Sequence, residues 1–194
     1  VTVQPESARA QEAIARGKAE LVQALPPAPE GVAIIKFDVS WFRKIEEKPK
    51  ARVCFSGLSP EAPLWSDRVE GLGLEGIRFR MHYQGEILHV KIPLIGRHSV
   101  HTALRAAAVG LVEGMNWQEI LDGLNQGHTQ LRLAAGRSET GALLLDDTYN
   151  ASPESMLAAL NLLDELDGRK VAVWGDMHEL GPYERGGHEM VGLR

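Results

Sequence analysis

The sequence predicts an α/β protein, and three patterns carry that prediction. Apolar residues alternate with polar ones over residues 77–92, they follow helical spacing over residues 100–112, and a strand–helix–strand pattern covers residues 142–174. The third pattern is typical of a βαβ unit, whose two strands are parallel. One such unit cannot cover both faces of a parallel sheet, so we expect it to begin a larger α/β domain.

Composition excludes several classes of protein. Hydrophobic residues make up 44% of the 194 residues and charged residues 24%, as in ordinary globular domains. The formal net charge of −5 argues against non-specific nucleic-acid binding, which needs clustered positive charge. No apolar run approaches the roughly 20 residues that span a bilayer, and no secretory signal is visible. The single cysteine, Cys54, excludes internal disulfides and fits a cytoplasmic location.

The first part of the chain predicts one helix followed by strands. Residues 7–25 have a helical pattern, with Ile14 and Leu21 on its apolar side. Residues 31–37 and 51–55 are short apolar runs of the kind found in buried strands.

The middle of the chain predicts a β-hairpin and two helices. The alternating residues 77–92 turn at Gly85, which is typical of a hairpin. Residues 100–112 form the clearest amphipathic helix of the sequence. A second helix is expected over residues 116–124, with Asn116 as its N-cap.

The last third predicts the βαβ unit. Residues 142–145 and 170–174 are apolar runs of strand length, and we expect them to be parallel neighbours in one sheet. The helix between them should begin at Ser152 and Pro153, because serine suits an N-cap and proline the first helical position. A domain boundary is expected within residues 133–140, where no pattern is strong.

The segment that follows the first strand of this unit, LDDTYNASP over residues 145–153, is the strongest candidate for chemistry. Two acids leave the carboxyl end of a strand, where ligands gather in open α/β sheets, and a helix N-terminus that favours anions follows. A carboxylate here could accept hydrogen bonds from ribose hydroxyls or coordinate a cation. Alternatively, Asp147 and Asn150 only satisfy backbone amides of the turn.

Several motifs resemble the Mur ligases, a family of ATP-dependent amide ligases. The resemblance covers most of the chain and is patchy from residue 36 to residue 75. It rests on DDTYNASPESM over residues 146–156, on VWGDMHELG over residues 173–181 with His188, on GRHSVHTAL over residues 96–104, on IARGKAEL over residues 14–21, and on Arg132, which precedes Asp147 by 15 residues.

The resemblance implies an architecture and a reaction. Residues 1–133 would be the latter part of a central ATP-binding domain, and residues 134–194 the first part of a C-terminal Rossmann-like domain. ATP with Mg²⁺ would phosphorylate the terminal carboxylate of UDP-N-acetylmuramoyl-tripeptide, and the amine of D-alanyl-D-alanine would attack the acyl phosphate. Such a reaction belongs to the synthesis of peptidoglycan precursors.

Residue roles follow only from this resemblance. A carbamate on Lys18 would hold Mg²⁺, with Glu6 as a second candidate metal ligand, and Arg132 would contact the γ-phosphate. The remaining candidates would surround the adenine and ribose: His98, Ser99, Thr102, Asp147, Tyr149 and Asn150. For His188 the resemblance gives no mechanistic role, and a histidine that packs its helix is the simpler interpretation.

Departures from the family pattern leave other hypotheses open. No Gly-rich run ending in Gly-Lys-Ser/Thr occurs in the 194 residues, so we expect the isolated chain not to turn over. Ser99 and Thr102 replace asparagines that face adenine in the family, and their hydroxyls have shorter reach. A non-catalytic binding module with a decayed nucleotide site is therefore an alternative. A ligase of the folate-polyglutamylation type is a third hypothesis, against which Tyr149 and Asn150 argue.

Overall fold

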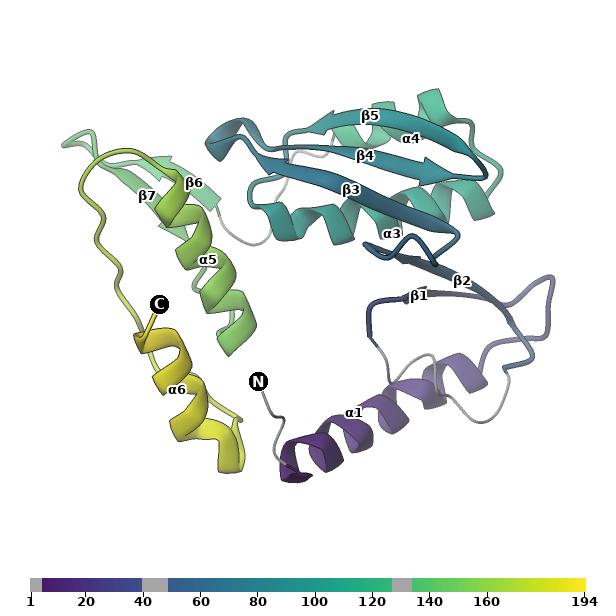
Figure 1. Cartoon of the computed structure of the whole chain (residues 1–194), viewed down its shortest axis with the longest axis horizontal. Helices are drawn as coiled ribbons and strands as arrows, with labels where there is room; N and C mark the ends of the chain where they lie inside the picture. Colours follow the sequence, from purple (N-terminus) through teal and green to yellow (C-terminus); the bar gives the residue numbers. More distant parts are fainter. Residues whose placement is uncertain (1–4, 40–48, 127–133) are drawn as a thin grey trace. The chain divides into compact units, whose positions relative to one another are not determined.

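A computed structural model of the chain describes residues 5–39, 49–126 and 134–194 (Figure 1). Five helices and seven strands lie in these ranges. The helices are α1 (Pro5–Gln23), α3 (Val100–Val112), α4 (Trp117–Asn125), α5 (Pro153–Glu165) and α6 (Glu184–Gly192). The strands are β1 (Val32–Lys36), β2 (Arg52–Gly57), β3 (Leu64–Gly71), β4 (Ile77–Tyr83), β5 (Glu86–Ile92), β6 (Ala134–Arg137) and β7 (Leu143–Asp146). Short 3₁₀ turns occupy Gly73–Glu75, Arg97–Ser99 and Gly181–Tyr183.

Strands β1 to β5 form one sheet in chain order. Strand β1 pairs with β2 in parallel, with Val32 beside Arg52, and β2 pairs with β3 in parallel through Ser56 and Gly57. Helix α3 packs against β1 and β2. Parallel strands covered by a helix confirm the predicted α/β class.

The chain divides into two compact units, each assembled from three stretches of sequence. The N-terminal unit contains Val1–Arg68, Phe79–Val90 and Val100–Leu124, and the C-terminal unit contains Val69–Arg78, Lys91–Ser99 and Asn125–Arg194. The candidate segments 96–99 and 146–150 are far apart in sequence, yet both belong to the C-terminal unit.

Strand β4 shows how the sequence pattern makes the core. Ile77, Phe79 and Met81 are at most 1% exposed. The residues between them, Arg78 and Arg80, point to the other face and bind carboxylates there. Because successive side chains of a strand point to opposite faces, the alternation in the sequence becomes one buried and one polar face.

The predicted turns and helix starts are confirmed. Gly85 has a φ of +86° in the two-residue turn between β4 and β5, a conformation that hairpin turns of this length favour. Asn116 Oδ1 accepts from the Glu119 amide, and Glu119 Oε2 accepts from the Asn116 amide. Ser152 and Ser155 make the same reciprocal pair at the start of α5. These are capping boxes, which satisfy amides that a helix leaves without partners.

The prediction of a strand at residues 170–174 is wrong. These residues run extended without pairing, and Val171 and Val173 are 67% and 90% exposed. Strand β7 pairs instead with β6 in antiparallel orientation, so the predicted parallel βαβ pair is not formed. An apolar run becomes a strand only where a neighbouring strand supplies hydrogen-bond partners, and β7 supplies none to this segment.

Three further features differ from the sequence-based expectation. Strand β3 was not predicted, because residues 66–68 are all polar, although Ser66 is 1% exposed in the structure. Strand β6 was not predicted, because its sequence AAGR has no large apolar side chain. The apolar side assigned to the first helix is wrong at Leu21, which is 75% exposed, whereas Ala19 is 6% exposed.

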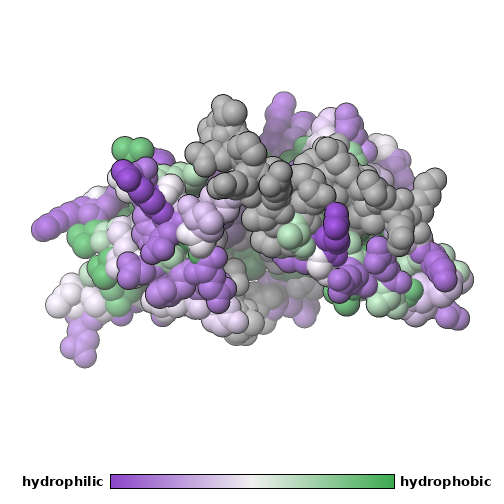
Figure 2. All heavy atoms as spheres, turned by 90° about the horizontal axis from the view of Figure 1, so that it is seen from below, coloured by the Kyte–Doolittle hydropathy of each residue, from purple (hydrophilic) through white to green (hydrophobic). Residues whose placement is uncertain are grey.

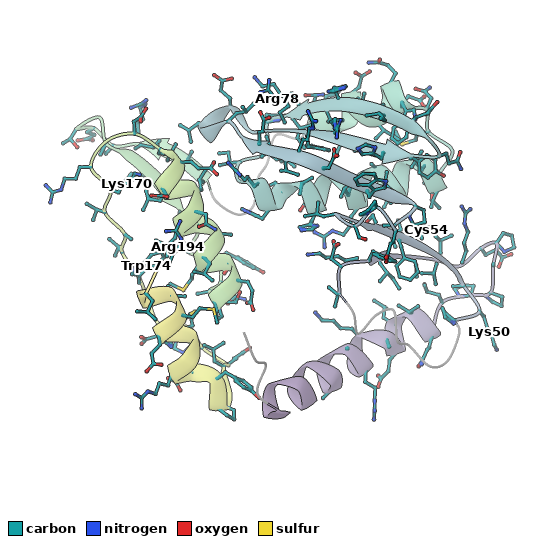
Figure 3. The ribbon with its side chains drawn as sticks, viewed as in Figure 1. Lys50, Cys54, Arg78, Lys170, Trp174 and Arg194 are labelled. Atoms are coloured by element: carbon teal, nitrogen blue, oxygen red, sulfur yellow. The ribbon has the colours of Figure 1, made fainter. Side chains whose placement is uncertain are left out.

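Exposed hydrophobic side chains lie on several elements. On the face drawn in Figure 2 they form small patches between hydrophilic residues. Figure 3 places Lys170 and Trp174 on the extended segment after α5, where Trp174 is 47% exposed. Within the described ranges, no helix combines the length and the apolar character needed to cross a bilayer.

A charged cluster on β3 and β4 stabilises the outer face of the sheet. Asp67 Oδ1 accepts from Arg80 Nε at 2.8 Å and lies 3.0 Å from His82 Nε2. The His82 ring stacks on Trp65, with centroids 3.8 Å apart and planes 9° apart. The hydrogen bond from Arg80, assisted by His82, holds the pKa of Asp67 well below its ordinary value.

Replacing Asp67 by asparagine should lower the free energy of unfolding by about 1–2 kcal/mol at pH 7. A folded-state pKa below the unfolded value of about 3.9 means that this stabilisation is complete above that pH and is lost as pH falls. The measurement is urea denaturation of both proteins at pH 7 and pH 3, and their difference should shrink at pH 3. The exposed pair Glu70–Arg78 provides the control, because Glu70→Gln should cost less than about 1 kcal/mol.

Candidate functional site

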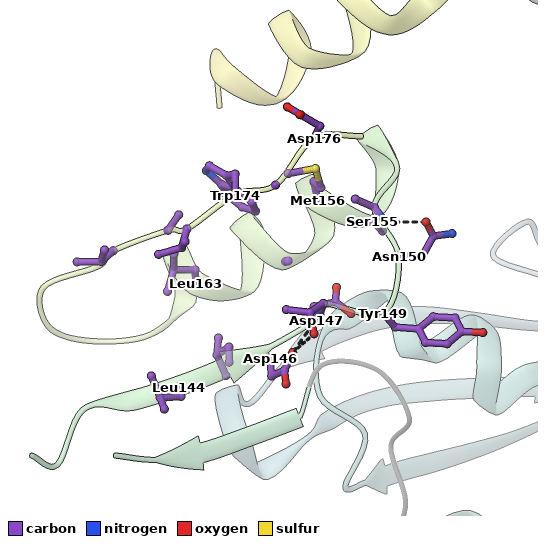
Figure 4. Close-up of a pocket in the computed structure, with 18 of the residues that line it drawn as sticks. Leu144, Asp146, Asp147, Tyr149, Asn150, Ser155, Met156, Leu163, Trp174 and Asp176 are labelled. Atoms are coloured by element: carbon purple, nitrogen blue, oxygen red, sulfur yellow. Dashed lines mark hydrogen bonds between the residues drawn. The ribbon is translucent and has the colours of Figure 1, made fainter. Parts of the chain in front are cut away.

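The C-terminal unit contains a cavity of about 740 Å³ between β7, α5 and the extended segment 171–176. Its walls are apolar along β7 and α5, where Leu145 and Leu163 line it. Its polar residues include loop 146–150, Ser155, Asp176 and His178. Figure 4 labels Asp147, Ser155 and Asp176 among them. This volume is within the range of small-molecule sites.

The two acids at the end of β7 have different environments. Asp146 Oδ1 accepts from both the amide and the hydroxyl of Thr148, and these two bonds lower the pKa of Asp146. Asp146 is therefore committed to the turn, whereas the alternative interpretation named Asp147 and Asn150 for this role. Asp147 is half-buried on the cavity wall. Thr148 donates to Asp146 rather than to Asp147. Of the two, Asp147 is better placed to accept from a ligand.

The start of α5 is a capped helix end. Pro153 has no N–H group, and the Ser155 amide donates to Ser152 Oγ. Glu154 adds a negative charge to the first turn. This helix start therefore offers an anion fewer backbone N–H donors than the anion-binding helix terminus that the sequence predicts.

Segment 95–99 is fixed on α5 and β7. Ile95 is 9% exposed and packs on Leu162, which is 2% exposed, together with Leu145. Two residues further on, Arg97 Nε lies 2.8 Å from Glu165 Oε1. The apolar contact of Ile95 and the ion pair of Arg97 hold this segment in place, and with it the adjacent residue His98.

His98 is thereby brought near Asp147. Withdrawal of the imidazole from water lowers the pKa of His98, and the negative charge of Asp147 opposes this shift. The two residues come from motifs that the sequence placed in the same site. An aromatic ring that stacks and a carboxylate that accepts hydrogen bonds are suited to the base and the ribose of a nucleoside.

The other candidate residues have varied positions. The Ser99 hydroxyl is buried and donates to the Ile95 carbonyl at 2.7 Å, so it is used within the protein. Thr102 is exposed and accepts from Arg105. Tyr149 is 77% exposed, and its ring points away from Leu163 and Trp174 in Figure 4.

Asn150 accepts from the Ala151 amide at 2.9 Å, as a turn residue does. Lys18 is exposed on α1. Arg132 and the side chain of Glu6 lie outside the described residues. Among the residues that are described, no three His, Cys, Asp or Glu side chains gather as a metal site would require.

Sequence reasoning did not assign Trp174, Asp176 and His178 to the cavity. Their motif enters the sequence-based prediction only through the family resemblance. A usable signal was the apolar run 170–174, which ends at Trp174 and is followed shortly by Asp176 and His178.

Gly96 controls the position of His98. Its φ of +83° favours glycine, and a Cβ atom there would lie 2.6 Å from His98 Cε1. Gly96→Ala should therefore displace the imidazole and lower nucleotide affinity by about tenfold, measured by calorimetry. Gly85→Ala is the matched control: its φ is +86° and nothing lies within 4 Å of the added Cβ. Equal affinity for the two variants would contradict a role of His98 in binding.

Two family models match the chain. The model described as "Mur ligase middle domain" matches residues 6–110, and the one described as "Mur ligase, glutamate ligase domain" matches residues 132–194. The first alone covers more than half of the 194 residues.

Similar proteins and structures carry related names. The UDP-N-acetylmuramoyl-tripeptide–D-alanyl-D-alanine ligases of Escherichia coli and Synechocystis are each 32% identical to the chain, over 92% and 94% of its length. MurF from Acinetobacter baumannii has 29% identity and a TM-score of 0.79, with 93% of this chain and 39% of that chain covered. MurF ligase from Thermotoga maritima, solved with ADP, shares the fold at 24% identity and a TM-score of 0.77, covering 94% and 41%. The chain spans about two fifths of the two curated relatives, 40% and 38%. The chain belongs to the Mur ligase family.

Proposed function

We propose that the chain is part of an ATP-dependent amide ligase that adds D-alanyl-D-alanine to UDP-N-acetylmuramoyl-tripeptide. Its contribution would be the adenine and ribose part of the nucleotide site. The observation that carries the proposal is the packing of segment 95–99 on α5 and β7, through Ile95 and through the Arg97–Glu165 ion pair, within one compact unit. This packing brings His98 close enough to Asp147 for the aspartate charge to act on the pKa of His98. The names of the relatives supply the substrates.

The domain division is part of the proposal. Residues 1–133 would be the latter part of the central ATP-binding domain, and residues 134–194 the first part of the C-terminal domain. The ranges of the two family models, 6–110 and 132–194, support this division.

The chemistry explains why a nucleotide is needed. A carboxylate is a poor electrophile, and transfer of the γ-phosphoryl group gives it a leaving group. The amine of the dipeptide then attacks the acyl carbon, and phosphate departs. In such a reaction the protein positions the reactants and neutralises phosphate charge. Asp147 would accept from the ribose hydroxyls, the His98 ring would lie against the base, and Tyr149 and Asn150 would border the nucleotide. Arg132 would contact the γ-phosphate.

Mg²⁺ would accompany ATP and supply charge neutralisation. Lys18 as a carbamate and Glu6 remain the proposed ligands from the protein. The exposed amine of Lys18 is accessible to carbon dioxide, but an unmodified ammonium repels a cation. The described residues contain no cluster of three potential ligands, and the side chain of Glu6 is not among them, so we assign no step to the metal.

Calorimetric titration of the chain with Mg–ATP, and with Mg–GTP as comparator, tests this proposal. We expect weak binding of ATP, weaker binding of GTP, and no turnover by the chain alone. The competing hypothesis is a binding module whose nucleotide site has decayed, and the buried Ser99 hydroxyl favours it. That hypothesis predicts no heat of binding for either nucleotide.

A further inference from the structure

His188 on α6 binds two backbone groups of opposite kind. Its Nε2 lies 3.2 Å from the Met177 amide nitrogen, and its Nδ1 lies 2.7 Å from the Glu184 carbonyl oxygen. An amide N–H can only donate, so Nε2 must be the unprotonated acceptor. A carbonyl oxygen can only accept, so Nδ1 must carry the proton. Both bonds are made by one form of the ring, the neutral imidazole with hydrogen on Nδ1.

The bond to Met177 holds a segment that is otherwise loosely attached. Residues 171–178 belong to no helix or strand, and Glu179 turns the chain with a φ of +63°. Within the described part of the chain, the backbone of residues 171–179 makes one hydrogen bond, the one to His188. No described strand pairs with them. The Met177 side chain is 2% exposed and packs with Met156 and Val191. The His188 imidazole and the buried Met177 side chain therefore hold the residues around Met177 in place on the cavity wall.

Helix α6 is itself firmly seated, so it can act as a support. Gly187 lets α6 pack closely against Leu180 and Pro153, because a Cβ atom at this position would lie 2.9 Å from Leu180 Cδ1 and 3.1 Å from Pro153 Cγ. Two residues after α6, Arg194 Nε donates to Asn161 Oδ1 of α5 at 3.0 Å. Figure 3 labels Arg194.

The residues on either side of Met177 are the ones that line the cavity. Asp176 and His178 are exposed and belong to its wall, whereas Met177 is buried. In an extended chain, neighbouring side chains point to opposite sides. Fixing the backbone and side chain of Met177 therefore holds Asp176 and His178 where they line the cavity.

We infer that His188 is a positioning residue: its neutral Nδ1–H form ties Met177 to α6 and so holds Asp176 and His178 on the cavity wall. Their use in binding a ligand rests on the proposed function. The attachment of Met177 to α6 does not rest on it, because it is defined by the contacts of His188 with the Met177 amide and the Glu184 carbonyl.

The form of the ring is measured in the unmodified chain by a ¹H–¹⁵N correlation spectrum of its seven histidines at neutral pH. The signals of His188 are those missing from the spectrum of His188→Gln. We expect the nitrogen pattern of a neutral ring protonated at Nδ1. A ring protonated at Nε2, or at both nitrogens, would overturn the inference without any variant having to fold differently.

The tie to Met177 is measured by amide hydrogen exchange in a matched pair of variants. In His188→Gln the side-chain amide oxygen replaces the ring nitrogen as acceptor, whereas His188→Leu keeps the bulk of the side chain and removes the acceptor. We expect exchange of the Met177 amide to accelerate about tenfold or more in His188→Leu and to stay near the original rate in His188→Gln. Equal rates in the two variants would overturn the inference. Neither experiment contains a nucleotide, so failure of the proposed function would leave both results interpretable.

Discussion

Asp147→Ala should lower the affinity of the chain for Mg–ATP by about tenfold or more in a calorimetric titration. A hydrogen bond to a charged group contributes roughly 1.5–3 kcal/mol, and about 1.4 kcal/mol corresponds to a factor of ten in affinity. Asp147 is half-buried on the cavity wall, and its charge acts on His98. Its removal therefore takes away an acceptor and changes the charge beside the imidazole.

Asp122→Ala is the control for this experiment. Asp122 is exposed on α4 and accepts from Gln118, outside the C-terminal unit. This substitution removes the same charge from the chain and should leave ATP affinity unchanged. If both variants lose affinity equally, the loss reflects net charge rather than the site, and the role given to Asp147 is wrong.

Phe79→Ala should cost about 3–5 kcal/mol of unfolding free energy, the largest stability effect that we expect. The ring is 1% exposed and lies on the inward face of β4 between Ile77 and Met81, which are equally buried. Truncation removes apolar contact and leaves a cavity that neighbours on a rigid strand cannot close. The measurement is the midpoint and slope of urea unfolding.

Ile87→Ala on the neighbouring strand β5 is the comparison, because Ile87 is 54% exposed. It should cost less than about 1 kcal/mol. A small effect of Phe79→Ala, within the range of Ile87→Ala, would mean that the face of β4 assigned to the core does not carry the stability of the sheet.

The elements that could be predicted from the sequence are those fixed by nearby residues. The hairpin turn depends on Gly85, and the starts of α4 and α5 depend on Asn116 and Ser152, each bonded to a residue three positions later. Residues 170–174 failed as a strand because pairing depends on a distant neighbour, which an apolar run does not reveal. The prediction for Leu21 failed for a related reason, because the buried side of a helix depends on what packs against it. In α1 the position described as buried is Ala19.

The same limit applies to the site. The sequence indicated two acids after β7, but only the turn geometry separates them, since Thr148 binds Asp146. The family motif placed Ser99 toward adenine, whereas in the structure the Ser99 hydroxyl donates to the Ile95 carbonyl. Small hydroxyl side chains take whichever nearby partner the backbone offers, so their direction cannot be taken from a motif. The contact between His188 and Met177 joins two motif residues whose relation was invisible in the sequence.

The central claim is that segment 96–99 and loop 146–150 form one adenine and ribose subsite. Photo-cross-linking with an azido-adenine analogue of ATP, followed by peptide mapping, tests it most directly. We expect label on peptides that contain His98 or Tyr149, competed by ATP and reduced in Asp147→Ala. Label confined to other peptides, or label on these peptides that ATP does not compete, would contradict the claim.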